Sequence, residues 1–132
     1  MLAAIAAFRE GRPWLTDLLA HLDRNRWLLG DLLAAHLPAV GYVRPEASYL
    51  AWLDCAGLGL GDDSAAHFLA EGRVALSPGL AFGANGAGFV RLNMGTSRAL
   101  LEEAVRRMTA AMAVQGVERG PASATSHRRP ES

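Results

Sequence analysis

The chain has 132 residues, of which 51% are apolar, so it is long enough to bury one hydrophobic core and too short for two domains. Thirteen basic residues balance thirteen acidic ones, and a chain without net charge has no field that would attract nucleic acid. The apolar runs are short and interrupted by charges, which argues against a membrane span, and the N-terminus lacks the basic residues of a secretory signal. The single cysteine, Cys55, excludes a disulfide within the chain and favours a cytoplasmic protein.

The basic residues are all arginine, and the sequence contains no lysine. A lysine amine is the group that forms a Schiff base with a carbonyl cofactor. This chain by itself therefore cannot carry out chemistry that depends on such a bond.

The first 40 residues are predicted to be helical. Residues 2–8 are apolar and compatible with a helix, and Pro13 suits the first turn of a second one. Gly30 indicates a break into two helices, and Pro38 ends the segment. The apolar positions recur at helical spacing and form one stripe: Leu15, Leu18, Leu19, Leu22, Leu29, Leu32, Leu33 and Leu37.

Residues 41–113 are predicted to form a small α+β domain. Short aromatic or β-branched runs bounded by turn residues predict three strands, over 48–55, 74–77 and 89–94. Asp62 and Asp63 are good caps for a helix that runs through Ala70, and Thr96 or Ser97 caps a final helix. The inner face of this final helix is expected to carry Leu100, Leu101, Ala104, Val105, Met108 and Met112. Helices would cover the three-stranded sheet, and residues 114–132 are predicted to be a disordered tail.

The predicted strand 89–94 carries an unusual pair of polar residues. Side chains alternate along a strand, so Phe89, Arg91 and Asn93 share one face, and the apolar residues between them face the core. An arginine in mid-strand needs a partner, because an unpaired buried charge is costly. Spacing alone favours an ion pair with a local Asp or Glu; the alternative is a site for the carboxylate of a ligand.

The connection 77–88 contains four glycines and also allows two interpretations. It is either a wide turn built around Asn85 and Gly86, or a loop that lines a pocket with Phe82 at its mouth. Other patterns in the sequence are weaker indications of a functional site. The glycines at 57–61 lack the spacing of a dinucleotide fingerprint, and the four histidines lack the spacing of a metal site. Cys55 is expected to be a small core residue.

Four motifs taken together resemble one enzyme family. They are P-E-x-x-Y-L-A-W-L-D at 45–54, V-x-L-x-P-G-x-x-F-G at 74–83, F-V-R-L-N at 89–93 and L-E-E-A at 101–104. Over about residues 5–113 the chain resembles the C-terminal small domain of pyridoxal phosphate (PLP) enzymes of the class I/II aminotransferase type. It is most similar to the MalY and PatB branch of cystathionine β-lyases. The leading helices resemble the helix that connects the two domains of those enzymes.

The resemblance implies that Arg91 binds the α-carboxylate of an amino-acid substrate, with Asn93 helping to orient it and Phe82 at the mouth of the site. Tyr49 and Trp52 are expected to serve in core and domain-interface packing rather than in catalysis. The family's large domain, which precedes this region, supplies the Schiff-base lysine and the rest of the PLP site. The chain alone is therefore expected to hold no catalytic or cofactor-binding residue and to be inactive, unless a separate large-domain chain complements it in a carbon–sulfur β-lyase or aminotransferase. Members of this family form homodimers.

Two further interpretations remain open. The chain is alternatively a non-catalytic binding module that self-associates through the leucine stripe at 15–37, since a domain without its partner exposes an apolar face. A truncated relic that folds poorly is the other alternative.

Overall fold

The computed structural model describes residues 2–118. Its main elements, in chain order, are α1 (Leu2–Glu10), α2 (Arg12–His36), β1 (Gly41–Tyr42), β2 (Leu50–Asp54), α3 (Ser64–Gly72), β3 (Ser77–Pro78), β4 (Phe89–Asn93) and α4 (Arg98–Glu118). Three short 3-10 helices lie in the connections: η1 (Ala56–Leu58), η2 (Gly79–Phe82) and η3 (Ala84–Gly86). No helix among the described residues is both long and apolar enough to span a membrane.

The N-terminal segment is helical, as predicted, but the break at Gly30 is wrong. Helix α2 is continuous through Gly30, whose open side faces the Tyr42 ring at an ordinary contact distance. The helix ends at His36, just before Pro38, as expected. The second helix predicted to start near Pro13 is present: the chain changes direction at Gly11, between α1 and α2.

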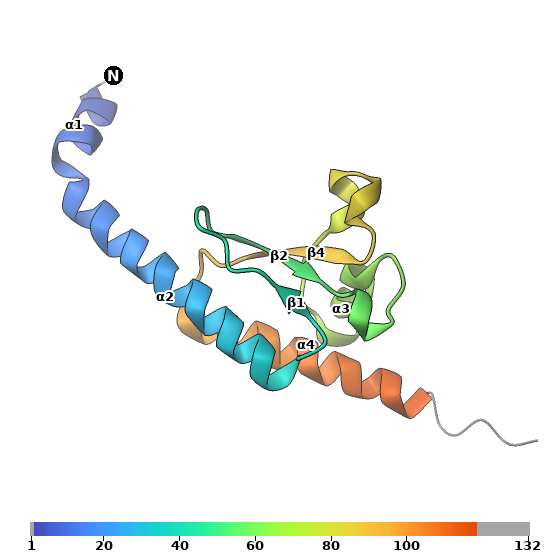
Figure 1. Cartoon of the computed structure of the whole chain (residues 1–132). Helices are drawn as coiled ribbons and strands as arrows, with labels where there is room; N and C mark the ends of the chain where they lie inside the picture. Colours follow the sequence, from blue (N-terminus) through green and yellow to red (C-terminus); the bar gives the residue numbers. More distant parts are fainter. Residues whose placement is uncertain (1, 119–132) are drawn as a thin grey trace, which may run out of the picture.

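Only the second half of the leucine stripe enters the core. Leu22, Leu29 and Leu33 are buried, whereas Leu15 and Leu19 are exposed. Figure 1 shows the reason: α1 and the first turns of α2 project beyond the sheet. Helical periodicity therefore located the apolar face correctly but not the point at which the body of the domain ends.

The sheet has four antiparallel strands in the order β1-β2-β4-β3, so the predicted number of three is wrong. The missed strand, β1, has two residues, which is too short to show an alternating pattern. The strand predicted over 74–77 is also shorter and later, at Ser77–Pro78, while Val74 packs into the core. The other two strands lie where the sequence placed them.

One face of the sheet forms the core. Ala51, Leu53, Val90 and Leu92 point to this face, and α2, α3 and α4 supply the residues that pack there. The opposite face carries no α-helix (Figure 1). The α+β class with helices on the sheet is therefore confirmed, and one face is left open.

The helix caps agree with the sequence, but the extent of α4 does not. Asp63 Oδ1 accepts a hydrogen bond from the Ala66 amide at 3.1 Å, and Ser97 Oγ accepts one from the Leu100 amide at 3.3 Å. Helix α4 continues to Glu118, so residues 114–118 are helical and not part of the predicted tail. The rest of that tail, 119–132, lies outside the described residues. Leu100, expected on the inner face of α4, is 62% exposed.

Candidate functional site

Arg91 occupies the middle of β4 on the open face of the sheet. Its strand neighbours are Trp52 on β2 and Ser77 on β3, each directly opposite it in the antiparallel register. The core residues Val90 and Leu92 on either side of it point the other way. The predicted alternation of β4 is thus correct, and it places the guanidinium on the face without helices.

The guanidinium of Arg91 has no carboxylate partner among the described residues, so the ion pair that spacing alone favoured is wrong. One Nη donates to Ser77 Oγ over a long 3.4 Å. The carbon of the guanidinium lies 4.4 Å from the centroid of the Phe82 ring, which is a cation–π contact. Most of the hydrogen-bonding edge of Arg91 is therefore available to another molecule.

Three aromatic rings form a row of contacts that ends at this arginine. The Trp52 and Phe82 rings meet edge to face, with centroids 5.7 Å apart and planes at 78°. On its other side, Trp52 stacks on Phe89 at 5.6 Å. Trp52 was expected to serve in core and domain-interface packing; it is 39% exposed and contacts Phe82, a predicted site residue. Its position opposite Arg91 on a neighbouring strand was the signal that sequence reasoning missed.

The loop that carries Phe82 is a folded unit and not a simple turn at Asn85 and Gly86. It consists of η2 and η3, and Figure 1 shows it rising above the sheet on the side away from α4. Gly79 and Gly86 are in close contact, because a Cβ on Gly79 would lie 2.1 Å from the Gly86 carbonyl oxygen. This contact fixes the loop backbone, so the interpretation as a loop beside the site is the one that the fold supports.

Asn93 lies on the same face of β4 but is not joined to Arg91. Its Oδ1 accepts a hydrogen bond from the Gly95 amide at 2.8 Å and closes the turn that follows the strand. Asn93 is exposed at the end of β4. The structure thus brings Arg91 and Phe82 together, whereas Asn93 lies two residues further along β4.

Other candidate groups do not form a second site. Cys55 is fully buried, and burial, with a smaller effect of Asp54, raises the pKa of its thiol to about 12. It is therefore a core residue, as expected, since the nucleophilic thiolate is absent near neutral pH. Among the described residues, no three His, Cys, Asp or Glu side chains are grouped to hold a metal ion.

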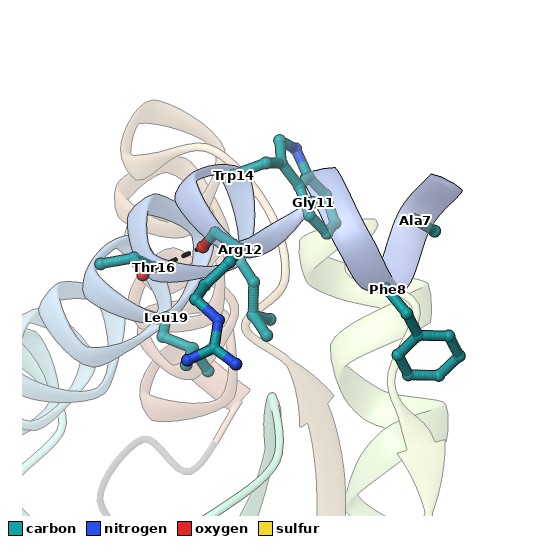
Figure 2. A pocket seen from close by; sticks show the side chains of 8 residues that line it. Ala7, Phe8, Gly11, Arg12, Trp14, Thr16 and Leu19 are labelled. Carbon is teal, nitrogen blue, oxygen red and sulfur yellow. Dashed lines mark hydrogen bonds between the residues drawn. The ribbon is translucent and has the colours of Figure 1, made fainter. Parts of the chain in front are cut away.

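A hollow of about 420 Å³ lies elsewhere, at the bend between α1 and α2. Figure 2 shows Phe8, Arg12 and Leu19 extending from one side of the helix, with Trp14 on another side. Phe8 is 90% exposed and Trp14 is 67% exposed. None of the predicted site residues contributes to this hollow, which is mainly apolar.

The residues of this chain do not fit the covalent anchor of PLP, because no lysine is present. What the chain offers is an available arginine beside an aromatic cluster, on the open face of a small α+β domain. The same architecture is found in the small domain of fold type I PLP enzymes.

No protein-family model matches the chain, but individual proteins do. A Mycobacterium tuberculosis protein provisionally named a cystathionine beta-lyase is 49% identical over 83% of this chain and 31% of its own length. Cystathionine beta-lyase PatB of Bacillus subtilis is 41% identical over 81% of this chain and 28% of its own.

Solved structures agree with these relatives. A PLP-bound protein of Clostridium difficile, provisionally assigned as an aminotransferase, superposes with a TM-score of 0.77 at 33% identity, over 81% of this chain and 28% of its own. A protein of Corynebacterium diphtheriae, provisionally assigned as a PLP-dependent beta-cystathionase, gives a TM-score of 0.76 at 35% identity, over 82% of this chain and 29% of its own.

The chain is homologous to the C-terminal domain of PLP-dependent cystathionine β-lyases and related aminotransferases. It spans about three tenths of the length of the relatives that it matches.

Proposed function

We propose that this chain is the substrate-carboxylate-binding domain of a carbon–sulfur β-lyase or aminotransferase that acts on amino acids. The observation that carries the proposal is the guanidinium of Arg91, which lies on the open sheet face without a carboxylate partner among the described residues. A carboxylate fits a planar guanidinium through two parallel hydrogen bonds. Because Phe82 covers a face of the group and not its edge, an approaching carboxylate keeps access to the N–H donors.

The neighbouring residues support the same role. The rings of Trp52, Phe82 and Phe89 form an apolar wall that would exclude water from one side of the ion pair and so strengthen it. Asn93 follows on the same face of β4, at about 7 Å along the strand, and its exposed side-chain amide would help to orient the carboxylate.

The chemical steps themselves require groups from outside this chain. PLP supplies an electron sink for carbanion chemistry in such enzymes, and its lysine would belong to a separate large domain. The residues of this chain would bind the substrate and orient it toward that domain. Whether elimination of sulfur or transamination follows is decided by groups outside this domain.

A chimera tests the proposal directly. The matching part of Bacillus subtilis PatB is replaced by this chain, and cleavage of cystathionine is measured with Arg91 and with Arg91→Gln. We expect the substitution to raise KM by about 10- to 100-fold, the value of a charged hydrogen bond to a substrate. Arg44→Gln is the matched control, because Arg44 stacks on the Trp27 ring at 3.4 Å and lies outside the site. Equal effects of the two substitutions, or no effect of Arg91→Gln, would contradict the proposal.

The projecting helices favour a second candidate, a self-associating module. Phe8, Trp14, Leu15 and Leu19 expose apolar surface on α1 and the start of α2, and such a surface promotes association. Light scattering after size-exclusion chromatography distinguishes the two candidates. The module predicts a dimer that Leu15→Glu and Leu19→Glu convert to a monomer, whereas a wild-type monomer would count against it.

A further inference from the structure

We infer that Trp52 is a positioning residue for Arg91, which it holds in place through the ring of Phe82. The inference rests on the proposed function, because the positioned guanidinium is the one that would receive the substrate carboxylate. It adds a role for a residue beyond the cation–π pair itself, which Arg91 forms with Phe82. The chain of contacts runs from Phe89 to Trp52, from Trp52 to Phe82 and from Phe82 to Arg91.

Arg91 needs such a support because its other contact is weak. The side chain has many rotamers, and the 3.4 Å hydrogen bond to Ser77 Oγ is longer than an ordinary one. A carboxylate would hold the group firmly, but it would also occupy the donors. An aromatic ring holds the guanidinium through its face and leaves the donors free, so the Phe82 ring both orients the charge and keeps it available.

Phe82 in turn cannot fix its own ring. It ends η2 on an exposed loop, and 53% of its surface is accessible. The contact between Gly79 and Gly86 holds the backbone of the loop but does not determine the side-chain rotamer. Among the described residues, Phe82 contacts one other aromatic ring, that of Trp52. The two rings meet edge to face at 5.7 Å, which is within the range that aromatic pairs prefer.

Trp52 is well suited to this role because it is itself anchored twice. Its backbone lies in β2, directly opposite Arg91 in the register of the sheet. Its indole is nearly parallel to the Phe89 ring, at 15° and 5.6 Å. The support for the loop residue Phe82 therefore comes from the rigid part of the fold, on the same two strands that carry Arg91.

The test uses the full chain and the NMR signals of the Arg91 side chain, which are assigned by their loss in Arg91→Lys. In the wild-type protein, the ring current of Phe82 is expected to move these signals upfield of their random-coil positions. Trp52→Leu and Phe82→Leu should each move them back, and the double variant should add nothing further. Trp52→Phe, which retains an aromatic edge, should restore most of the shift. Trp27→Leu is the matched control, because it removes an exposed tryptophan that stacks on a different arginine, Arg44.

The functional consequence is measured with L-alanine as the probe, followed on the same signals. Trp52→Leu should weaken its binding about two- to fivefold, the range expected for loss of an exposed cation–π contact, and Trp52→Phe should restore it. If Trp52→Leu does not fold, Trp52→Met takes its place.

Two results would overturn the inference: Arg91 signals that stay at the wild-type position in Trp52→Leu, or shifts for Trp52→Leu and Phe82→Leu that add independently. A different result addresses the proposed function. If L-alanine leaves the Arg91 signals of the wild-type chain unchanged while the variants shift as expected, carboxylate binding is contradicted and the positioning of Arg91 by Trp52 is still supported.

Discussion

Asn25 on α2 donates a hydrogen bond to the backbone carbonyl of Met94, 69 residues further along the chain, at 2.8 Å. The same amide nitrogen lies 2.8 Å from the Thr96 carbonyl oxygen, which also contacts His21 Nε2 at 2.8 Å. Asn25 is only 2% exposed. This one side chain therefore ties the long helix to the segment that leads from β4, the Arg91 strand, into α4.

Replacing Asn25 with Leu should destabilise the protein by about 2–3 kcal/mol. The change keeps the branched shape of the side chain, but it removes the donor to the Met94 carbonyl and one of the two groups that contact the Thr96 carbonyl. Urea unfolding followed by circular dichroism measures the effect as a lower midpoint at an unchanged slope. Asn85→Ala, on the exposed loop, is the control and should change stability by less than about 0.5 kcal/mol. If the Asn25→Leu variant is as stable as the control, the hydrogen bonds of Asn25 contribute nothing to stability.

The adjacent leucines of α4 provide a direct test of which face of this helix is buried. Leu101 is 1% exposed and Leu100 is 62% exposed. We expect Leu101→Ala to cost about 2–5 kcal/mol of the free energy of unfolding, because it leaves a cavity in the core. Leu100→Ala should cost less than about 0.5 kcal/mol. The reverse order in thermal or urea unfolding would mean that α4 is rotated about its axis.

Two glycines should respond oppositely to substitution by alanine. A Cβ on Gly79 would overlap the Gly86 carbonyl oxygen, so Gly79→Ala should open the loop and displace Phe82. The expected result is lower stability and loss of the ring-current shift on Arg91. At Gly30, within α2, the nearest atom to a new Cβ is 3.5 Å away. Gly30→Ala should therefore stabilise the protein by about 0.5–1 kcal/mol, which calorimetry would detect as a higher Tm. A destabilised Gly30→Ala variant would show that α2 is not regular at this point.

Glu103 on α4 should titrate well below the ordinary range of a glutamate. Hydrogen bonds from Arg106 and Arg107 lower its pKa from the ordinary 4.5 to about 2. A lowered pKa means that the ion pairs contribute fully above about pH 4.5 and are lost as the pH falls toward 2. The group is exposed, so the effect on stability is small and is best followed by NMR of the Glu103 carboxyl carbon.

Glu103→Gln is the control for this titration and should remove the pH dependence from the neighbouring arginine signals. A midpoint near 4.5 in the wild-type protein would show that these ion pairs do not persist in solution.

Several features of the fold followed from the sequence because their cause is local. The alternation along 89–94 placed Arg91 opposite the core face, and Ser97 and Asp63 mark the helix starts through hydrogen bonds to amides only three residues away. The break predicted at Gly30 was wrong because a glycine destabilises a helix by only about 1 kcal/mol, which packing on Tyr42 offsets.

Other features depend on contacts between distant segments. The two-residue strand β1 exists only because β2 is available to pair with it. The environment of Arg91 likewise could not be read from spacing, since Ser77 and Phe82 reach it through the fold. The buried contact of Asn25 could have been predicted from the sequence. Asn25 is a polar residue on the apolar face defined by Leu22 and Leu29, where a buried side chain requires a hydrogen-bond partner.

Helix α2 acts as a lever arm. Its 25 residues extend for about 37 Å, with the His36 end set in the body of the domain and the Arg12 end beyond it. A tilt of about 5° at the anchored end moves the free end by about 3 Å. Asn25 lies on the same rigid rod and is bonded to the segment that follows the Arg91 strand. A partner that binds the Arg12 end of α2 would therefore also set the angle between itself and the open sheet face.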